Sequence, residues 1–293
     1  MANSPAHKLG QLIGNFIEEK CASTLQQVCS HRHLYLDVVG HSRPARSGKK
    51  VTWEDIYGSK HDLDFVIERF GNETRLGEPV ALIECAWRRY TKHSKNKAQE
   101  IQGAVLPIAA KHFMQKPFLG AIIAGDFTAP SIEQLNSCGF VTLYFPSEDV
   151  FASFESHGVN VRYDENTSDL TASTMVNNFE RLSTEQKDSV WQTLQFRTNQ
   201  SIEAFRSRLI ATLDRRISTV LISALYGNKL VFYTVDEAIL FLEQSDFSRV
   251  PHNSMFQTIY VKVEFGNNDK IEGSFSSPSA ARDMLQRILS NHL

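Results

Sequence analysis

The sequence predicts an α/β protein in which helices flank a mixed central sheet, followed by a C-terminal α+β region. Helical and strand patterns alternate as far as residue 155, residues 79–87 are almost continuously apolar, as in a central strand, and the pattern changes near residue 165. With 293 residues, 42% of them hydrophobic, the chain can form two cores of ordinary size. We therefore expect a core over residues 1–164 and a second region over residues 165–293.

The first half of the chain alternates between two kinds of apolar pattern. Apolar side chains recur every three or four positions in the predicted helices, which span residues 7–29, 98–109, 131–138 and 147–154. The predicted strands are short and apolar, and they span residues 33–40, 61–70, 79–87, 118–124 and 140–145. The second and third of these strands follow each other closely and are expected to form a hairpin. The order implies a mixed sheet with helices on its faces.

The C-terminal region begins with a predominantly helical segment over residues 171–213. Two strand–turn–strand–helix patterns then follow, with little residue identity between them. Their strands and helices span residues 218–225, 229–233, 235–244, 257–265, 270–275 and 279–289. The repetition predicts tandem ββα units, and a single continuous sheet fits the pattern equally well.

Charge and hydropathy restrict the class of protein. The formal net charge is only -2, from 31 basic and 33 acidic residues, so any affinity for nucleic acid has to come from a local patch. There is no run of 18 apolar residues, and residues 1–10 lack the apolar core of a secretory signal. We therefore expect a cytoplasmic protein that does not contact membranes.

Two carboxylates stand out in the predicted hairpin. Glu84 lies late in an otherwise apolar strand, where a charge is costly unless it is paired or binds a metal. Asp64 lies near the start of the preceding strand, with Asp62 as an alternative for its role. A buried ion pair of Glu84 with Arg88 or Lys97 is the simpler interpretation, and a shared metal site is the functional one.

Basic side chains gather in two segments, over residues 40–50 and 88–97. Clustered basic side chains displace counterions from a nucleic-acid backbone, although both segments are also compatible with ordinary solvated loops. The candidates for contacts with DNA are Arg43, Arg46, Lys49, Arg88, Arg89 and Lys95. Trp87 and Tyr90, beside the second segment, are candidates for stacking on bases.

The segment Asp64-Phe-Val-Ile, then Val80-Ala-Leu-Ile-Glu84, then a basic helix start and a further strand, resembles the PD-(D/E)xK nuclease superfamily. Within it, the sequence is most similar to a prokaryotic type II restriction endonuclease, over roughly residues 7–155. The resemblance implies a restriction-endonuclease-like core that hydrolyses double-stranded DNA with Mg²⁺, for which Mn²⁺ can substitute. It also implies a homodimer that cuts both strands of a symmetric site. Asp64 and Glu84 take the places of the motif's two metal-binding carboxylates.

The sequence departs from the motif where the family has a lysine, because that position is Ala86. Within this superfamily the lysine can move onto the following helix. Lys97 is the first candidate for its replacement and Lys92 the second. The departure also supports an alternative, a DNA-binding or scaffold protein on a catalytically degenerate nuclease core. A DNA repair nuclease is a nearer variant.

Further acidic residues are candidates for the metal site. Glu100 lies on the same expected helix face as Lys97, and some members of the superfamily take their last acidic ligand from this helix. Glu18 or Glu19, from the first helix, can supply another carboxylate, although a solvent-facing position is the simpler reading of both.

Overall fold

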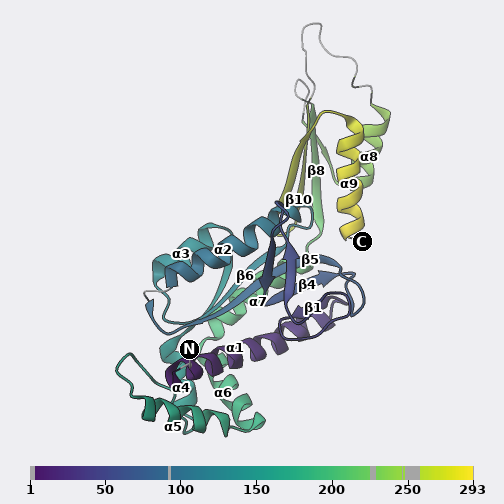
Figure 1. Ribbon diagram of the computed structural model, residues 1–293. Coiled ribbons are helices and arrows are strands. Elements are labelled where there is room, and N and C mark those ends of the chain that lie inside the picture. Colours follow the sequence, from purple (N-terminus) through teal and green to yellow (C-terminus); the bar gives the residue numbers. More distant parts are fainter. Residues whose placement is uncertain (1–3, 92–93, 225–228, 246, 248–257, 293) are drawn as a thin grey trace. The chain divides into compact units, whose positions relative to one another are not determined.

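The computed structural model describes residues 4–91, 94–224, 229–245, 247 and 258–292 (Figure 1). The chain divides into two compact units, Met1–Lys111 with Pro117–Ile210, and His112–Lys116 with Ala211–Leu293. Each unit has its own sheet and its own helices. No helix in the described ranges is long and apolar enough to cross a membrane.

A five-stranded mixed sheet forms the centre of the first unit, as the sequence predicts. Its strands run in the order β1-β4-β5-β6-β7. The β1–β4 and β4–β5 pairs are antiparallel, whereas the β5–β6 and β6–β7 pairs are parallel. Their bounds are β1 Tyr35–Val38, β4 Phe65–Arg69, β5 Glu78–Arg88, β6 Phe118–Gly125 and β7 Val141–Pro146. The predicted hairpin of the second and third strands is confirmed as the β4–β5 pair.

Helices cover the sheet on both faces (Figure 1). The side chains of Leu82 and Ala86 in β5 pack in one apolar cluster with Ala98 and Ile101 of α2. The intervening residues of β5 face the other way, where α1 contacts the strand and a Cβ at Gly14 would lie 3.4 Å from Trp87. The helices of this unit are α1 Pro5–Ser30, α2 Ser94–Lys111, α3 Ala129–Ser137, α4 Ser147–Glu155, α5 Asp169–Glu180, α6 Thr184–Arg197 and most of α7 Asn199–Leu213.

The segment predicted as one strand over residues 61–70 is two strands that meet at Asp64. β3 (Lys60–Leu63) pairs with β2 (Val51–Glu54) in a separate two-stranded sheet. β4 pairs with β1 and β5 in the central sheet. The chain therefore changes its pairing partners at Asp64, which removes that residue from both ladders and frees its side chain for other contacts.

The division between the units lies later than the predicted boundary at residue 164. α5 and α6 belong to the first unit because their aromatic side chains pack on α1. The ring centroid of Phe16 lies 6.4 Å from that of Phe179 and 6.3 Å from that of Trp191. The helical segment after residue 165 therefore completes the core of the first unit.

The second unit contains the strands and helices of both strand–turn–strand–helix patterns that the sequence predicts, and the predicted turn of the first pattern, within residues 225–228, lies outside the described residues. The two hairpins join through β8 and β10 into a single antiparallel sheet of order β11-β10-β8-β9. The two predicted alternatives are thus both correct in part, because the ββα pattern repeats and the sheet is continuous. The elements are β8 Ile217–Ala224, β9 Leu230–Phe232, α8 Val235–Gln244, β10 Ile259–Phe265, β11 Lys270–Phe275 and α9 Pro278–His292.

Candidate functional site

Asp64 lies at the point where β4 separates from β5. The β4–β5 ladder begins at the pair Phe65 and Ile83, so the next residues of β5 have no β4 residue opposite them. The backbone N–H of Cys85 donates a 2.7 Å hydrogen bond to Asp64 Oδ2, in place of a ladder carbonyl. The backbone carbonyl of Asp64 in turn accepts from the N–H of Val39 at 2.9 Å. These contacts fix the carboxylate beside the open edge of β5.

Glu84 occupies the same part of β5 and is only 6% exposed. It shares the sheet face of Leu82 and Ala86, toward α2, by the alternation of the strand. Its Oε2 lies 3.7 Å from Lys97 Nζ, whereas its buried Oε1 has no hydrogen-bond partner among the described residues. A buried carboxylate oxygen without a partner is costly, so Oε1 is a position where a cation would be stabilised.

The pKa values of three carboxyl groups, those of Glu18, Asp64 and Glu84, are raised here, and the charge of Asp64 contributes to the shifts of the other two. Burial, followed by the negative charge of Asp64, raises the pKa of Glu84 to about 8, against an opposing effect of Lys97. Burial also raises the pKa of Asp64, against the Cys85 N–H and Lys97. On α1, burial and the charge of Asp64 raise the pKa of Glu18 to about 7. Like charges held together in a partly buried site favour binding of a cation.

Lys97 lies in the first turn of α2 and contacts this carboxylate cluster, formed by Glu18, Asp64 and Glu84. Its side chain is 17% exposed, and its Nζ lies 3.7 Å from both Glu84 Oε2 and Glu100 Oε2. Lys97, the first of the two candidates for the role of the lysine missing at Ala86, thus lies near Glu84. Lys92 lies outside the described residues.

Of the other acidic candidates, Glu100 shares Lys97 with Glu84, whereas Asp62 and Glu19 lie elsewhere. Glu100 is 60% exposed and lies between two cations, Lys97 and Arg88, at 3.7 and 3.8 Å. Asp62 pairs with Lys50 at 2.6 Å on the two-stranded sheet. Glu19 is exposed, because one residue along a helix is a rotation of ~100° and carries it away from the side that Glu18 faces.

The donor set of the cluster suits a hard divalent cation. Within residues that the structure describes, no three His, Cys, Asp or Glu side chains already form a metal-binding group. Mg²⁺ keeps several waters and is commonly held by one or two carboxylates together with substrate phosphates. Asp64 and Glu84, with the unpartnered Oε1, meet that smaller requirement, and Glu18 adds negative charge on the α1 side.

Two of the basic residues predicted to contact DNA have structural roles instead. Arg43 is 1% exposed, and its guanidinium donates to Asp37, Glu68 and backbone carbonyls, with distances of 2.6–3.0 Å. Arg46 donates two 2.9 Å hydrogen bonds to Asp37. Both arginines neutralise buried carboxylates, so neither guanidinium is available to a phosphate. The sequence held a signal for this role, because Asp37 and Glu68 are carboxylates in predicted strands.

The remaining basic candidates differ in how strongly the fold holds them. Lys49 and Lys95 are exposed. Arg88 is partly exposed, with its NH2 near Glu100 and its NH1 donating to the carbonyl of Trp87 at 3.0 Å. Arg89 is held by Asp126 and by the carbonyl of Tyr163. Lys49, Lys95 and Arg88 are therefore the predicted contacts that remain accessible.

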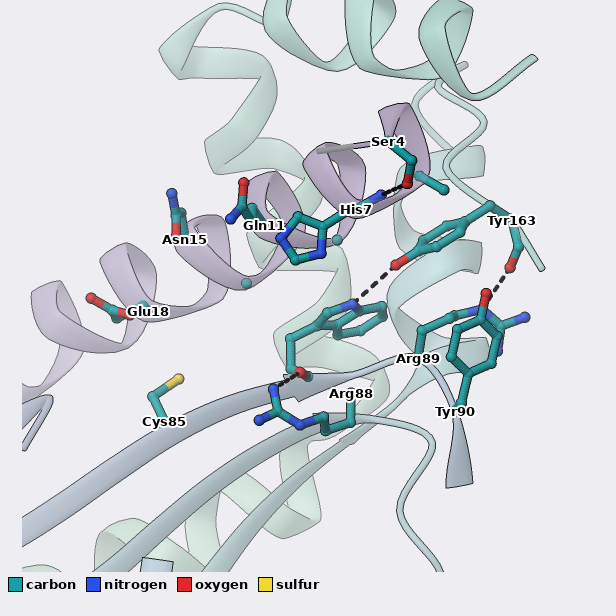
Figure 2. A pocket seen from close by; sticks show the side chains of 14 residues that line it. Ser4, His7, Gln11, Asn15, Glu18, Cys85, Arg88, Arg89, Tyr90 and Tyr163 are labelled. Atoms are coloured by element: carbon teal, nitrogen blue, oxygen red, sulfur yellow. Dashed lines mark hydrogen bonds between the residues drawn. The ribbon is translucent and has the colours of Figure 1, made fainter. Parts of the chain in front are cut away.

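A cavity of about 450 Å³ lies between α1 and the end of β5, and Glu18 of the carboxylate cluster lines it. Polar residues of α1 line one side, namely His7, Gln11, Asn15 and Glu18. The end of β5 and the residues that follow line the other side, from Cys85 to Tyr90. Figure 2 shows these side chains projecting from successive turns of α1 and from the strand. Two sequence signals point to this cavity: the turn spacing of the polar residues on α1, and the aromatic pair Trp87 and Tyr90 beside the basic segment.

Comparisons of the chain with protein-family models, with curated proteins and with solved structures found no significant match.

Proposed function

We propose that this chain is a Mg²⁺-dependent endonuclease that hydrolyses phosphodiester bonds of double-stranded DNA, as a type II restriction enzyme does. One observation carries the proposal. Asp64, Glu84 and Lys97 come together where β4 separates from β5, and the buried Oε1 of Glu84 has no partner among the described residues. Two carboxylates and one ammonium group, held by the ends of strands and the first turn of a helix, are the groups that such hydrolysis uses.

A bound divalent cation would supply Lewis acidity to the scissile phosphate and lower the pKa of an attacking water. Asp64, at the break between β3 and β4, and Glu84, in β5, would hold it. The Cys85 N–H keeps the Asp64 carboxylate in a fixed orientation. Lys97 Nζ lies close enough to Glu84 to orient a water or to balance charge that develops on the phosphate. Lys97 would thereby take the role that Ala86 cannot perform.

The DNA substrate and the dimer are further parts of the proposal. Lys49, Lys95 and Arg88 are accessible cations for the DNA backbone. A homodimer would place two cluster sites on the two strands of a symmetric sequence. The four-stranded sheet and paired helices of the second unit would supply recognition or dimer contacts, since strands and helices both fit the major groove.

The test is cleavage of plasmid and phage DNA by the purified protein with Mg²⁺ or Mn²⁺. Discrete fragments that disappear on chelation of the metal support a restriction enzyme, whereas smeared products indicate a nonspecific or structure-directed nuclease. Binding of DNA without any cleavage would favour the degenerate scaffold. A methyltransferase gene beside the gene for this chain would independently support a restriction system.

Matched variants test the site itself. Glu84→Gln and Asp64→Asn keep the shape of each side chain, and each should reduce cleavage by ~10²-fold or more, as loss of an electrostatic contact in a transition state does. Asp62→Asn is the control, because Asp62 pairs with Lys50 outside the cluster. Lys97→Ala should lose activity and the exposed Lys95→Ala should retain catalysis. Lys92→Ala completes the set, and an active Glu84→Gln enzyme would exclude the site.

A further inference from the structure

The cavity between α1 and the end of β5 lies next to the carboxylate cluster, because one member of the cluster, Glu18, lines it. Glu18 lines the cavity and lies in the electrostatic field of Asp64. Cys85 also lines it, and its backbone N–H holds the Asp64 carboxylate at 2.7 Å. A molecule whose phosphate lies beside Asp64 would therefore have this cavity next to it.

The α1 side of the cavity offers hydrogen bonds that the fold does not use. His7, Gln11, Asn15 and Glu18 recur at spacings of three and four residues, so they share one face of the helix (Figure 2). Among the described residues, neither the Gln11 nor the Asn15 side chain has a hydrogen-bond partner. Each amide carries both a donor and an acceptor, the combination that recognises the edges of bases.

The β5 side of the cavity is aromatic and positively charged. Trp87 and Tyr90 line it, and the Trp87 indole N–H is fixed by a 3.4 Å hydrogen bond to Tyr163. The accessible Arg88 lines this side and supplies the positive charge. Arg89 is held by Asp126 and by the Tyr163 carbonyl, with its guanidinium 5.7 Å from the centre of the Tyr90 ring. Aromatic rings stack on bases and arginines bind phosphates, which suits a nucleotide better than an apolar ligand.

The size of the cavity limits its occupant. A volume of about 450 Å³ lies within the ~300–1,000 Å³ range of small-molecule sites, so the cavity can enclose one nucleotide and is too small to enclose a base-paired duplex. A duplex substrate would therefore have to present a nucleotide that has left the base stack. Enzymes that act on DNA do extrude single nucleotides in this manner, at a cost of a few kcal/mol.

We infer that this cavity binds one unstacked nucleotide of the DNA substrate, adjacent to the phosphate at the carboxylate cluster. Gln11 and Asn15 contact the edge of its base, and Trp87 and Tyr90 contact its ring. The inference rests on the proposed action on DNA. It adds that this cavity selects the nucleotide at which the DNA is deformed. Contacts of this kind contribute sequence specificity in two ways: they recognise the edge of the base, and they favour bases that leave the stack at low cost.

Photocrosslinking tests the inference without requiring cleavage. The full chain carrying Glu84→Gln is mixed with random-sequence duplex DNA in which 5-iododeoxyuridine replaces thymidine, and it is then irradiated. Crosslinked peptides are identified by mass spectrometry. We expect crosslinks to residues 85–90. The double variant Gln11→Ala, Asn15→Ala should reduce their yield at least fivefold. Gln27→Ala is the matched control and should leave the yield within twofold, since Gln27 is an exposed residue of α1 outside the cavity.

The outcomes separate this inference from the proposed function, because cleavage by the wild-type chain is measured independently on plasmid DNA. Crosslinks only outside the cavity, no crosslinks, or equal yields from the double variant and Gln27→Ala would each overturn the nucleotide site. If the plasmid is cleaved and one of these results is obtained, the nuclease proposal is supported and the nucleotide site is refuted. If crosslinks form in the cavity and depend on Gln11 and Asn15, but no DNA is cleaved, the nucleotide site is supported and the catalytic proposal is refuted.

Discussion

Replacement of Glu84 by glutamine should change the pH dependence of stability. The folded state raises the pKa of Glu84 from 4.5 to about 8, mainly through burial and then through the charge of Asp64. The folded protein therefore retains a proton that the unfolded chain releases. Glu84 therefore does not lower the free energy of unfolding at pH values below its unfolded pKa of 4.5. Its destabilising effect grows as the pH rises and is complete above its folded pKa of about 8. Glu84→Gln removes this penalty.

The size of the effect follows from the shift. A tenfold change in a proton-binding constant corresponds to ~1.4 kcal/mol, so the penalty at alkaline pH is roughly 2–5 kcal/mol, with the upper figure set by the full difference between 4.5 and about 8. For a domain of this size, 1 kcal/mol moves the Tm by ~2–4 °C. Glu84→Gln should therefore raise the Tm by several degrees more at pH 9 than at pH 5.

Thermal unfolding followed by circular dichroism, at both pH values, measures this difference. Asp62→Asn serves as the control: Lys50 and Thr52 hold the pKa of Asp62 below its usual range, so Asp62 is ionised in the folded and unfolded states at both pH values and Asp62→Asn should change the Tm equally at pH 5 and pH 9. Mg²⁺ should stabilise the wild-type protein at pH 9 and should have a much smaller effect on Glu84→Gln. A difference in Tm between wild type and Glu84→Gln that is the same at both pH values would refute the reasoning.

Three further predictions follow from the same contacts. At subsaturating Mg²⁺, the cleavage rate should increase as the pH rises through about 7 and about 8, where Glu18 and Glu84 lose their protons. A higher Mg²⁺ concentration should move this increase to lower pH. A cleavage rate that does not change over this pH interval would contradict metal binding by the carboxylate cluster. Arg43→Ala should lower the free energy of unfolding by ~3–5 kcal/mol in urea titrations, because it leaves buried carboxylates unpaired, and a loss below 1 kcal/mol would argue against the network. Lys49→Ala and Lys95→Ala should each weaken DNA binding equally for all sequences and reduce the salt dependence by about one phosphate contact, whereas unchanged salt slopes would remove them from the DNA interface.

Much of the architecture could be predicted because it depends on local pattern. The periodicity of apolar residues predicted α1 over residues 7–29, and the structure has it over Pro5–Ser30. The apolar run over residues 79–87 predicted the central strand β5, and α8 matches its prediction over residues 235–244. These features need only the spacing of side chains, which the sequence states directly.

The break at Asp64 could not be predicted from the same rules. Residues 61–70 have the composition of one strand, yet β3 pairs with β2 and β4 pairs with β1 and β5. The choice of pairing partner depends on segments far away in the sequence, so strand propensity carries no information about it. The packing of Phe16 on Phe179 and Trp191, which moves the division between the units beyond residue 210, is also a long-range contact.

The sequence by itself determined the α/β class, the mixed sheet and the choice of Asp64 and Glu84, because an isolated carboxylate in an apolar strand requires a partner wherever the strand lies. Only the tertiary structure decided which neighbours complete the cluster. It brought Lys97 next to Glu84, turned Glu18 rather than Glu19 toward Asp64, and buried Arg43 against Asp37 and Glu68. Composition gives each of these residues the same charge in any fold, whereas the environment of that charge depends on contacts between elements that are distant along the chain.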